Sequence, residues 1–235
     1  MTDQPDDQSA ESNDDDRTGR ARVDRRRFLI GAGAAVAGVA AVLAFGLRGG
    51  RGKSVPLGPL STVLSDFPVR SAESAPPASA LDRWTIEVGG LVARPLKLTV
   101  ADLATLPRVG MTRDFHCVEG WSVDRVRWAG VRLAEVLDRA QPQAAAGFVT
   151  FHTFGGLYVD SLTMAEGRDP SVLLADSLDG APLPREHGGP VRLVVPAQLG
   201  YKNVKWVTRV ELTDHRDVGY WEQHGYPVEA PIGGA

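Results

Sequence analysis

The sequence predicts an α+β domain built on a mixed β-sheet with short helices. Several short apolar stretches alternate with polar residues, which is typical of half-buried strands. Short helical signals lie between these stretches, and no long alternation of strands and helices predicts a doubly wound parallel sheet. With 235 residues and 43% hydrophobic content, the chain is long enough for one substantial domain.

The individual elements follow from local patterns. Residues 84–88 alternate apolar and polar side chains and end at Gly89, which predicts the first strand. A second short strand is predicted around residues 96–98. The spacing of residues 99–102 is that of a capping box, so a short helix is expected to follow and to end at Pro107. The same reasoning predicts extended segments at 109–118, 148–153, 157–162, 172–175, 191–195 and 204–212, a turn at Asp179-Gly180, and helices at 132–140 and after a second capping box at 163–166.

The chain before this domain has three segments of different composition. Residues 1–27 form a tail that begins with an acidic part, which we expect to be disordered, and ends with an arginine-rich part that holds six arginines. Residues 28–47 are uncharged and long enough to span a membrane as a helix. Residues 48–66 are rich in Gly, Pro and Ser and predict a linker to the domain, which we place at 67–235.

The arginine-rich junction, residues 24–29, resembles a twin-arginine export signal, in which two arginines precede x-Phe-Leu. An ordinary single-pass anchor is the alternative. Both readings predict an exported domain, periplasmic or at the outer face of the cytoplasmic membrane, with the N-terminal segment in contact with that membrane. From residue 54 onward the chain has 17 Lys and Arg against 21 Asp and Glu, so nucleic acid is not an expected partner.

The stretch 113–122 holds Cys117, the sole cysteine of the chain. A soft thiolate suits a transition metal or nucleophilic catalysis. His116 is poorly placed as a base, because neighbouring side chains of an extended segment point to opposite faces, although a distant histidine remains available. No short Cys and His spacing predicts a zinc site. A buried, inert cysteine is the remaining alternative. We expect Arg113 and His116 to favour the thiolate, and Trp121 to help exclude water.

Four motifs resemble the molybdopterin-binding domain of the sulfite oxidase superfamily. They are the strings at 117–122 with 128–133, 184–196, 200–206 and 219–226. The branch that they resemble most is the bacterial periplasmic enzyme that reduces protein methionine sulfoxide. The resemblance implies a molybdenum-molybdopterin cofactor and oxygen-atom transfer, with sulfoxide reduction as the first expectation. The alternatives are sulfite oxidation within the same superfamily, or a cofactor-free binding domain tethered to the membrane.

The resemblance also implies roles for individual residues. Cys117 supplies the protein sulfur ligand of molybdenum, and Arg113, His116 and Trp121 are expected beside it at the catalytic centre. The pterin contacts fall on Thr153, His187, Arg192, Asn203, Val204 and Lys205. A guanidinium and an ammonium suit the cofactor's phosphate. Plain structural roles remain open: Arg192 paired with a surface carboxylate, Lys205 as a solvated strand residue, and Thr153 as strand filler.

The sequence departs from that branch at His187, where an asparagine is usual, and its upstream Asn and Tyr-Glu contacts find no clear counterpart between residues 66 and 80. The eukaryotic sulfite oxidases carry additional arginines around the anion pocket, so sulfite is not the first expected substrate. The chain has no haem-binding string, flavin signature or iron-sulfur cysteines. We therefore expect a small or protein-bound oxo-transfer substrate and a separate electron-transfer partner, such as a membrane haem protein.

Overall fold

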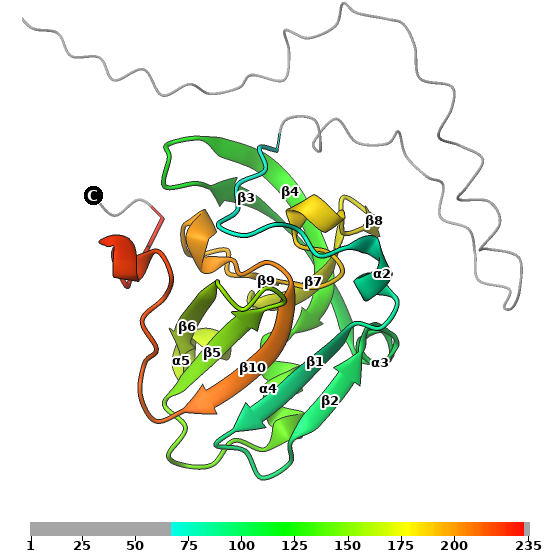
Figure 1. Ribbon diagram of the computed structural model, residues 1–235, viewed down its shortest axis with the longest axis vertical. Helices are drawn as coiled ribbons and strands as arrows, with labels where there is room; N and C mark the ends of the chain where they lie inside the picture. Colours follow the sequence, from blue (N-terminus) through cyan, green and yellow to red (C-terminus); the bar gives the residue numbers. More distant parts are fainter. Residues whose placement is uncertain (1–66, 233–235) are drawn as a thin grey trace, which may run out of the picture.

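The computed structural model describes residues 67–232 (Figure 1). The predicted acidic tail, export segment and linker over 1–66 lie outside these residues. Two five-stranded sheets are present, ordered β2-β1-β10-β5-β6 and β3-β4-β7-β8, with β9 paired to β7. The strands are β1 Thr85–Gly90, β2 Leu96–Thr99, β3 Arg108–His116, β4 Ser122–Arg132, β5 Phe148–Thr153, β6 Val159–Thr163, β7 Leu173–Leu178, β8 Ala181–Pro182, β9 Arg192–Val194 and β10 Val207–Thr213.

Short helices connect these strands, as the sequence predicts. The α-helices are α2 Ala78–Leu81, α3 Val100–Thr105, α4 Leu133–Ala140 and α5 Met164–Gly167, and the 3-10 turns are η1 Arg185–His187, η2 Gly200–Lys202 and η3 Glu222–His224. Both capping boxes are confirmed: Thr99 and Asp102 cap α3, and Thr163 and Glu166 cap α5 through reciprocal side-chain and backbone bonds. In the described part of the chain, no helix is long and apolar enough to cross a membrane.

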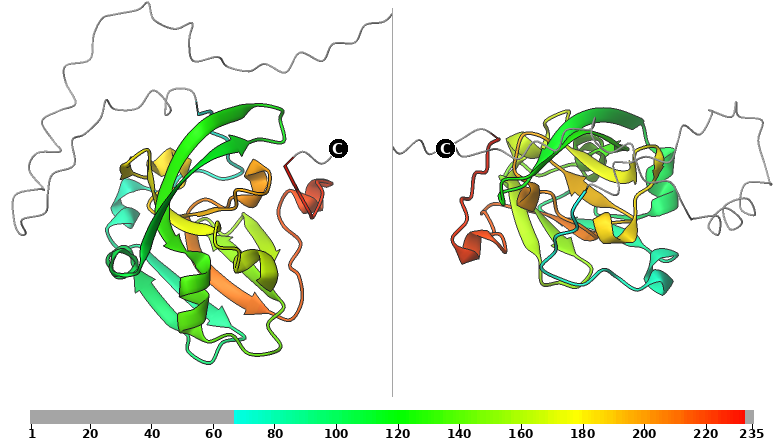
Figure 2. Two further views of the ribbon diagram at one scale, coloured as in Figure 1. Left: turned by 180° about the vertical axis from the view of Figure 1, so that it is seen from behind. Right: turned by 90° about the horizontal axis from the view of Figure 1, so that it is seen from above.

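The first sheet is mixed, because β1 pairs with β10 in parallel while its other pairs are antiparallel. Helix α4 covers one face of this sheet (Figure 2). Its residues Leu133, Val136 and Leu137 are fully buried in one core with Phe151 and Val210. This burial confirms the amphipathic helix that the sequence predicts.

The second sheet is a feature that the sequence patterns did not reveal. Its longest strand, β4, contains no regular alternation because its buried residues Val123, Val126 and Trp128 are unevenly spaced. Arg125 has a positive φ of 54°, and the β3–β4 register shifts between Arg113 and Phe115. Such a bulge moves side chains to the other face and hides the strand from a period-two search.

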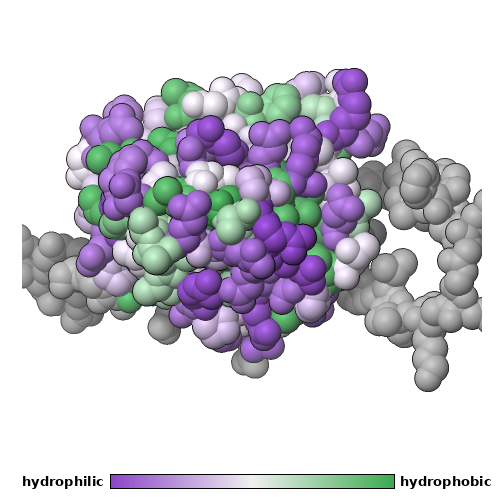
Figure 3. All heavy atoms as spheres, turned by 90° about the horizontal axis from the view of Figure 1, so that it is seen from below, coloured by the Kyte–Doolittle hydropathy of each residue, from purple (hydrophilic) through white to green (hydrophobic). Residues whose placement is uncertain are grey.

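Strands β3 and β4 form a long hairpin at one end of the molecule (Figure 1). Phe67 packs beneath it, 4.8 Å from the ring of Phe115 and 4.9 Å from that of His187. The opposite end of the molecule carries mainly hydrophilic side chains with scattered apolar ones (Figure 3). The hairpin end therefore differs from the opposite end by its aromatic cluster. Most of the predicted site residues also lie at the hairpin end.

Candidate active site

A pocket under the β3–β4 hairpin collects most of the predicted site residues. It encloses about 880 Å³ of space, a figure that includes the solvent at its open mouth. Its lining comes from residues 67–73, the β3–β4 hairpin, the turn between β5 and β6, η1 with the start of β9, the 200–206 loop, and the C-terminal segment, residues 214–232. The predicted residues in its lining are Cys117, Trp121, Thr153, His187, Arg192, Asn203 and Lys205.

The β3–β4 loop presents Cys117 to this pocket. The Cys117 N–H donates to the Trp121 carbonyl at 2.9 Å, and the Gly120 N–H donates to the Cys117 carbonyl at 3.0 Å. Gly120 has a φ of 89°, a left-handed conformation that favours glycine. This tight turn leaves the thiol half-buried at the pocket wall.

Burial raises the pKa of the Cys117 thiol, and the nearby Arg70 opposes that rise only weakly. Arg113 and His116, which the sequence places beside the thiol, are not among the groups that influence its pKa. Arg113 is exposed and donates to the Thr112 carbonyl at 3.0 Å, and neither residue lines the pocket. The His116 Nδ1 instead lies 2.8 Å from the Ser122 hydroxyl.

Arg192 begins β9 and is the most deeply buried cation of the pocket, with 2% exposure. Its terminal nitrogens donate to the carbonyls of His187 at 2.8 Å and Asn203 at 3.0 Å. Its Nε is buried without a hydrogen-bond partner, and no carboxylate of the described residues lies within ion-pair distance. Burial lowers the pKa of Arg192 to about 10. Pairing with a surface carboxylate is therefore not its role.

Lys205 adds a second positive charge without a counter-ion in the described structure. Its ammonium donates to the carbonyls of Arg70 at 2.7 Å and Glu186 at 2.8 Å. Burial, reinforced by the positive charge of Arg192, lowers the pKa of Lys205 to about 7. It lies in the loop before β10, not on a solvated strand. The protonated form of Lys205 adds to the positive potential of Arg192, and an anionic ligand would favour that form.

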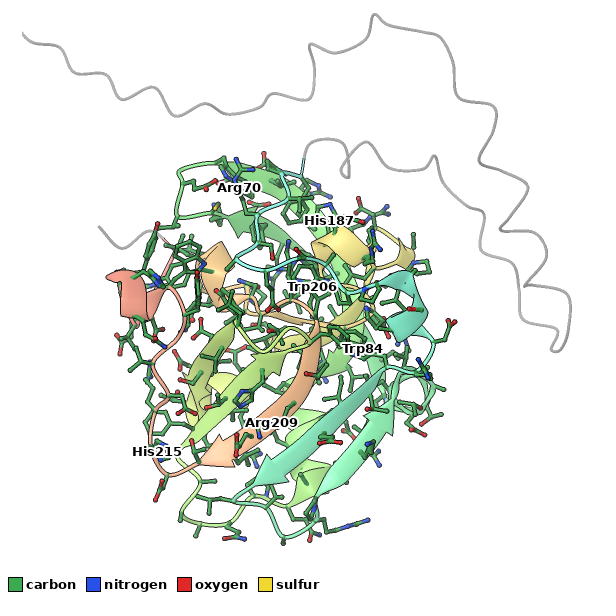
Figure 4. All side chains as sticks on the ribbon, in the orientation of Figure 1. Arg70, Trp84, His187, Trp206, Arg209 and His215 are labelled. Carbon is green, nitrogen blue, oxygen red and sulfur yellow. The ribbon has the colours of Figure 1, made fainter. Side chains whose placement is uncertain are left out.

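His187 lies beside these cations and is 6% exposed. Burial first, and then the charges of Arg192 and Lys205, lower its pKa to about 4, so the ring is neutral at pH 7. His187 and Arg70 lie toward the hairpin end, whereas Arg209 and His215 lie toward the other end of the first sheet (Figure 4). Among the described histidines, His187 alone lines the pocket. A general base must accept the proton of the cysteine, and the low pKa of His187 disfavours that step. The alternative of a Cys-His nucleophile is therefore weakened.

The remaining predicted residues have mainly supporting contacts. Thr153 is buried and its hydroxyl donates to the Tyr158 carbonyl at 3.2 Å. The Asn203 side chain accepts from the Val195 N–H at 2.7 Å and so fixes the 200–206 loop. Val204 has 1% exposure and packs in the core, outside the pocket lining. Its carbonyl accepts the Leu193 N–H at 2.8 Å.

Sequence reasoning missed several residues of the lining. Arg70 pairs with Glu119 at 2.9 Å, although 49 positions separate them. Trp221 and Tyr226 form an aromatic wall with ring centroids 5.3 Å apart. Glu119 and the two aromatic residues stand in the motifs quoted above, whereas no local pattern marks Arg70. Across residues 67–232, no cluster of three or more His, Cys, Asp or Glu side chains is arranged to hold a metal.

Comparison with known proteins agrees with the motifs. The oxidoreductase molybdopterin binding domain matches residues 73–221. The uncharacterized oxidoreductase YuiH of Bacillus subtilis (strain 168) is 34% identical over 169 residues, which is 72% of this chain and 84% of YuiH. The crystal structure of the sulfane dehydrogenase SoxCD from Paracoccus pantotrophus matches with a TM-score of 0.54 and 27% identity. That match covers 60% of this chain and 41% of the SoxCD chain. The chain belongs to the oxidoreductase molybdopterin-binding family, and it is a molybdopterin-dependent oxidoreductase with the predicted α+β fold of sulfite oxidase type.

Proposed function

We propose that this protein transfers an oxygen atom to or from sulfur and that it reduces uncharged sulfoxides in preference to oxidising sulfite. In this proposal Cys117 is the protein ligand of molybdenum, and Arg192, Lys205, His187, Asn203, Thr153 and the Val204 backbone hold the pterin. The bound cofactor supplies the redox chemistry, while the chain binds, orients and shields it.

The cationic end of the pocket fits the cofactor's phosphate. Arg192 has a buried Nε without a partner, and the Lys205 amine is hydrogen-bonded only to carbonyl oxygens. An anion bound there would compensate both charges and accept a charge-assisted hydrogen bond. The neutral ring of His187 can exchange hydrogen bonds with an uncharged heterocycle without adding to the charge. These properties support the cofactor assignments that the resemblance implies.

The surroundings of Cys117 support an uncharged substrate, and this observation carries the proposal. Phe67, Trp121 and Trp221 line the pocket with the thiol. The nearby cation, Arg70, is already paired with Glu119 at 2.9 Å. A sulfite anion would find little uncompensated positive charge there, whereas a sulfoxide needs an apolar cleft with few polar groups. Arg192 and Lys205 are assigned to the phosphate in this scheme.

The direct test compares two reactions of the purified holoenzyme. Reduction of free and protein-bound sulfoxides by an artificial electron donor is measured beside oxidation of sulfite by an artificial acceptor. We expect faster sulfoxide reduction, and a predominance of sulfite oxidation would overturn the proposal. Cys117→Ser is expected to lower turnover by more than about 100-fold, beyond the effect of a supporting residue, with an unchanged circular dichroism spectrum. Surviving activity would disprove the ligand assignment.

The ion pair between Arg70 and Glu119 provides a sharper test of substrate charge. Glu119→Gln would leave Arg70 uncompensated near the thiol, so kcat/KM for sulfite should rise relative to that for a sulfoxide. Because both side chains are partly exposed, we expect about a threefold to fivefold change. The matched double variant, with Arg70→Gln added, should restore the original ratio. A ratio that does not respond to Glu119→Gln would show that charge at this position does not select the substrate.

We also propose export and membrane attachment through residues 17–47, together with electron exchange with a separate membrane haem protein. The arginine-rich junction followed by an uncharged stretch supports export. Replacing Arg25 and Arg26 by lysine should retain the protein in the cytoplasm, as cell fractionation would show. Normal export of this variant would exclude the twin-arginine route. Electron exchange with isolated membranes, followed by haem absorbance, tests the partner, and unchanged haem spectra during turnover would count against it.

A further inference from the structure

A buried cluster of three charged side chains lies directly behind the pocket lining. Lys202 contacts Asp160, and its Nζ also lies 2.5 Å from Glu222 Oε1 and 3.2 Å from the Ser161 carbonyl. The three side chains are 1–3% exposed. None of them lines the pocket. The cluster therefore has no direct contact with a ligand and acts through its neighbours.

The cluster contains one lysine and two acidic side chains, so its charges cancel only when one carboxyl group is protonated. Burial raises the pKa of Asp160 to about 7 against the opposing effect of Lys202. Buried ion pairs seldom stabilise a fold more than apolar residues of similar size, and their best-supported role is to specify one geometry. This costly arrangement suggests that the relative position of the joined segments matters.

The three members come from segments that each carry pocket residues. Asp160 lies on β6 just after Tyr158, Lys202 lies between Tyr201 and Asn203, and Glu222 follows Trp221. Lys202 of η2 and Glu222 of η3 are in contact, and the two turns are neighbours in Figure 1, where they are coloured orange and red. The Tyr158 hydroxyl contacts the Tyr201 carbonyl, which adds a second link between β6 and the 200–206 loop.

The packing around Glu222 leaves little freedom for the C-terminal segment. The second Glu222 oxygen accepts the Gly219 N–H at 2.8 Å, two residues before Trp221. A Cβ added to Gly219 would lie 3.0 Å from the Asp160 carboxyl group and 3.1 Å from that of Glu222. A displacement of either carboxylate would therefore be transmitted to Trp221, and through the ring contact to Tyr226.

We propose that Lys202 and Glu222 are positioning residues that hold the aromatic wall of Trp221 and Tyr226 against the 200–206 loop and thereby set the size of sulfoxide that the pocket admits. The size selection rests on the proposed function, whereas the positioning of the wall does not. A wall held by charges on three segments keeps one width. Without the ionic contact the wall opens and discriminates less against bulky substrates.

The test uses Glu222→Gln in the full-length holoenzyme, because glutamine keeps the size of the side chain but not its charge. Amide hydrogen exchange of residues 219–226 should increase about tenfold in the variant, since a weakened local contact lowers the cost of opening. The ratio of kcat/KM for methyl p-tolyl sulfoxide over dimethyl sulfoxide should rise about fivefold. Molybdenum content should stay the same, which separates the wall from the cofactor site.

Two further variants serve as a second perturbation of the cluster and as a control. Gly219→Ala perturbs the same cluster by steric contact and should shift both quantities in the same direction. Glu211→Gln removes a surface ion pair with Arg209 at 2.8 Å outside the pocket and should change neither.

The outcomes separate the two claims. Unchanged exchange in both Glu222→Gln and Gly219→Ala would overturn the positioning role, and faster exchange with an unchanged selectivity ratio would overturn the size selection. If the wild-type enzyme reduces no sulfoxide, the proposed function and its size selection fail, while hydrogen exchange still decides the positioning role.

Discussion

Two lysines on the same loop, Lys202 and Lys205, have opposite electrostatic surroundings. Lys202 contacts the carboxylates of Asp160 and Glu222. Lys205 contacts two backbone carbonyls and feels the positive charge of Arg192. The protein itself supplies the counter-ions of the first lysine. The second lysine lacks one among the described residues, and it is the one that faces the pocket.

This difference separates a structural charge site from a ligand-binding one. An uncompensated buried cation lowers the stability of the folded chain, because burial penalises the charged form. The pKa of Lys205 falls to about 7 for this reason. An anionic ligand removes that penalty when it binds, so part of the lost stability reappears as affinity. The contrast predicts that breaking the Lys202 cluster damages the fold, whereas changing the Arg192 and Lys205 site damages cofactor binding.

The largest expected effect is on the Lys202 cluster. Lys202→Met leaves two buried carboxylates without their cation, so we expect the free energy of unfolding to fall by about 3–5 kcal/mol. Urea denaturation of the cofactor-free protein at pH 7.5 measures the change. A loss no greater than that of an exposed pair, for which Lys97→Met beside Glu87 is the control, would contradict the role of this cluster.

The next effect concerns Arg192. Arg192→Met removes the buried guanidinium that we propose as a phosphate contact, so affinity for molybdopterin should fall about 10-fold to 100-fold, as for other supporting groups of metal sites. Stability of the cofactor-free protein should fall by only about 1–2 kcal/mol, because the lost hydrogen bonds are offset by removal of an uncompensated charge. Molybdenum analysis and urea denaturation measure the two quantities. Equal losses of stability in Lys202→Met and Arg192→Met would remove the distinction between the sites.

The sequence predicted most elements of the fold where local patterns carry the information. Capping boxes at Thr99 and Thr163 and the apolar face of α4 depend on spacings of a few residues. Strand β4 was missed because its register shift breaks the alternation. The number of sheets also depends on long-range pairing, which one chain without aligned relatives does not show.

The candidate site also divides into residues that local motifs indicate and residues that only the tertiary structure brings together. Cys117, Arg192 and Lys205, which their motifs indicate, line one pocket, and their roles toward a cofactor stay predictions. Arg113 was placed at the site because it is close to Cys117 in sequence, yet it is exposed and outside the pocket. The pairing of Arg70 with Glu119 depends on tertiary structure and had no local signal.

The two charge sites should also differ in their response to pH. Burial raises the pKa of Asp160 from 3.8 to about 7. The folded state thus holds this proton more tightly than the unfolded state, and its contribution to stability is lost as pH rises from about 4 to 7. Burial lowers the pKa of Lys205 from 10.5 to about 7. The folded state releases that proton earlier, so this contribution grows as pH rises from about 7 to 10.5.

Variants isolate these contributions from the other ionisable groups. Relative to wild type, Asp160→Asn should remove a falling component of stability below pH 7, and Lys205→Met a rising component above pH 7. Each component is at most about 1.4 kcal/mol per pH unit, the limit for one proton. Urea denaturation of the cofactor-free proteins across pH 4 to 10 measures both. If the stability of either variant follows the same pH dependence as wild type over its pH range, the pKa shift assigned to that side chain is contradicted. A bound cofactor should suppress the Lys205 component alone, because only that lysine gains a counter-ion from the ligand.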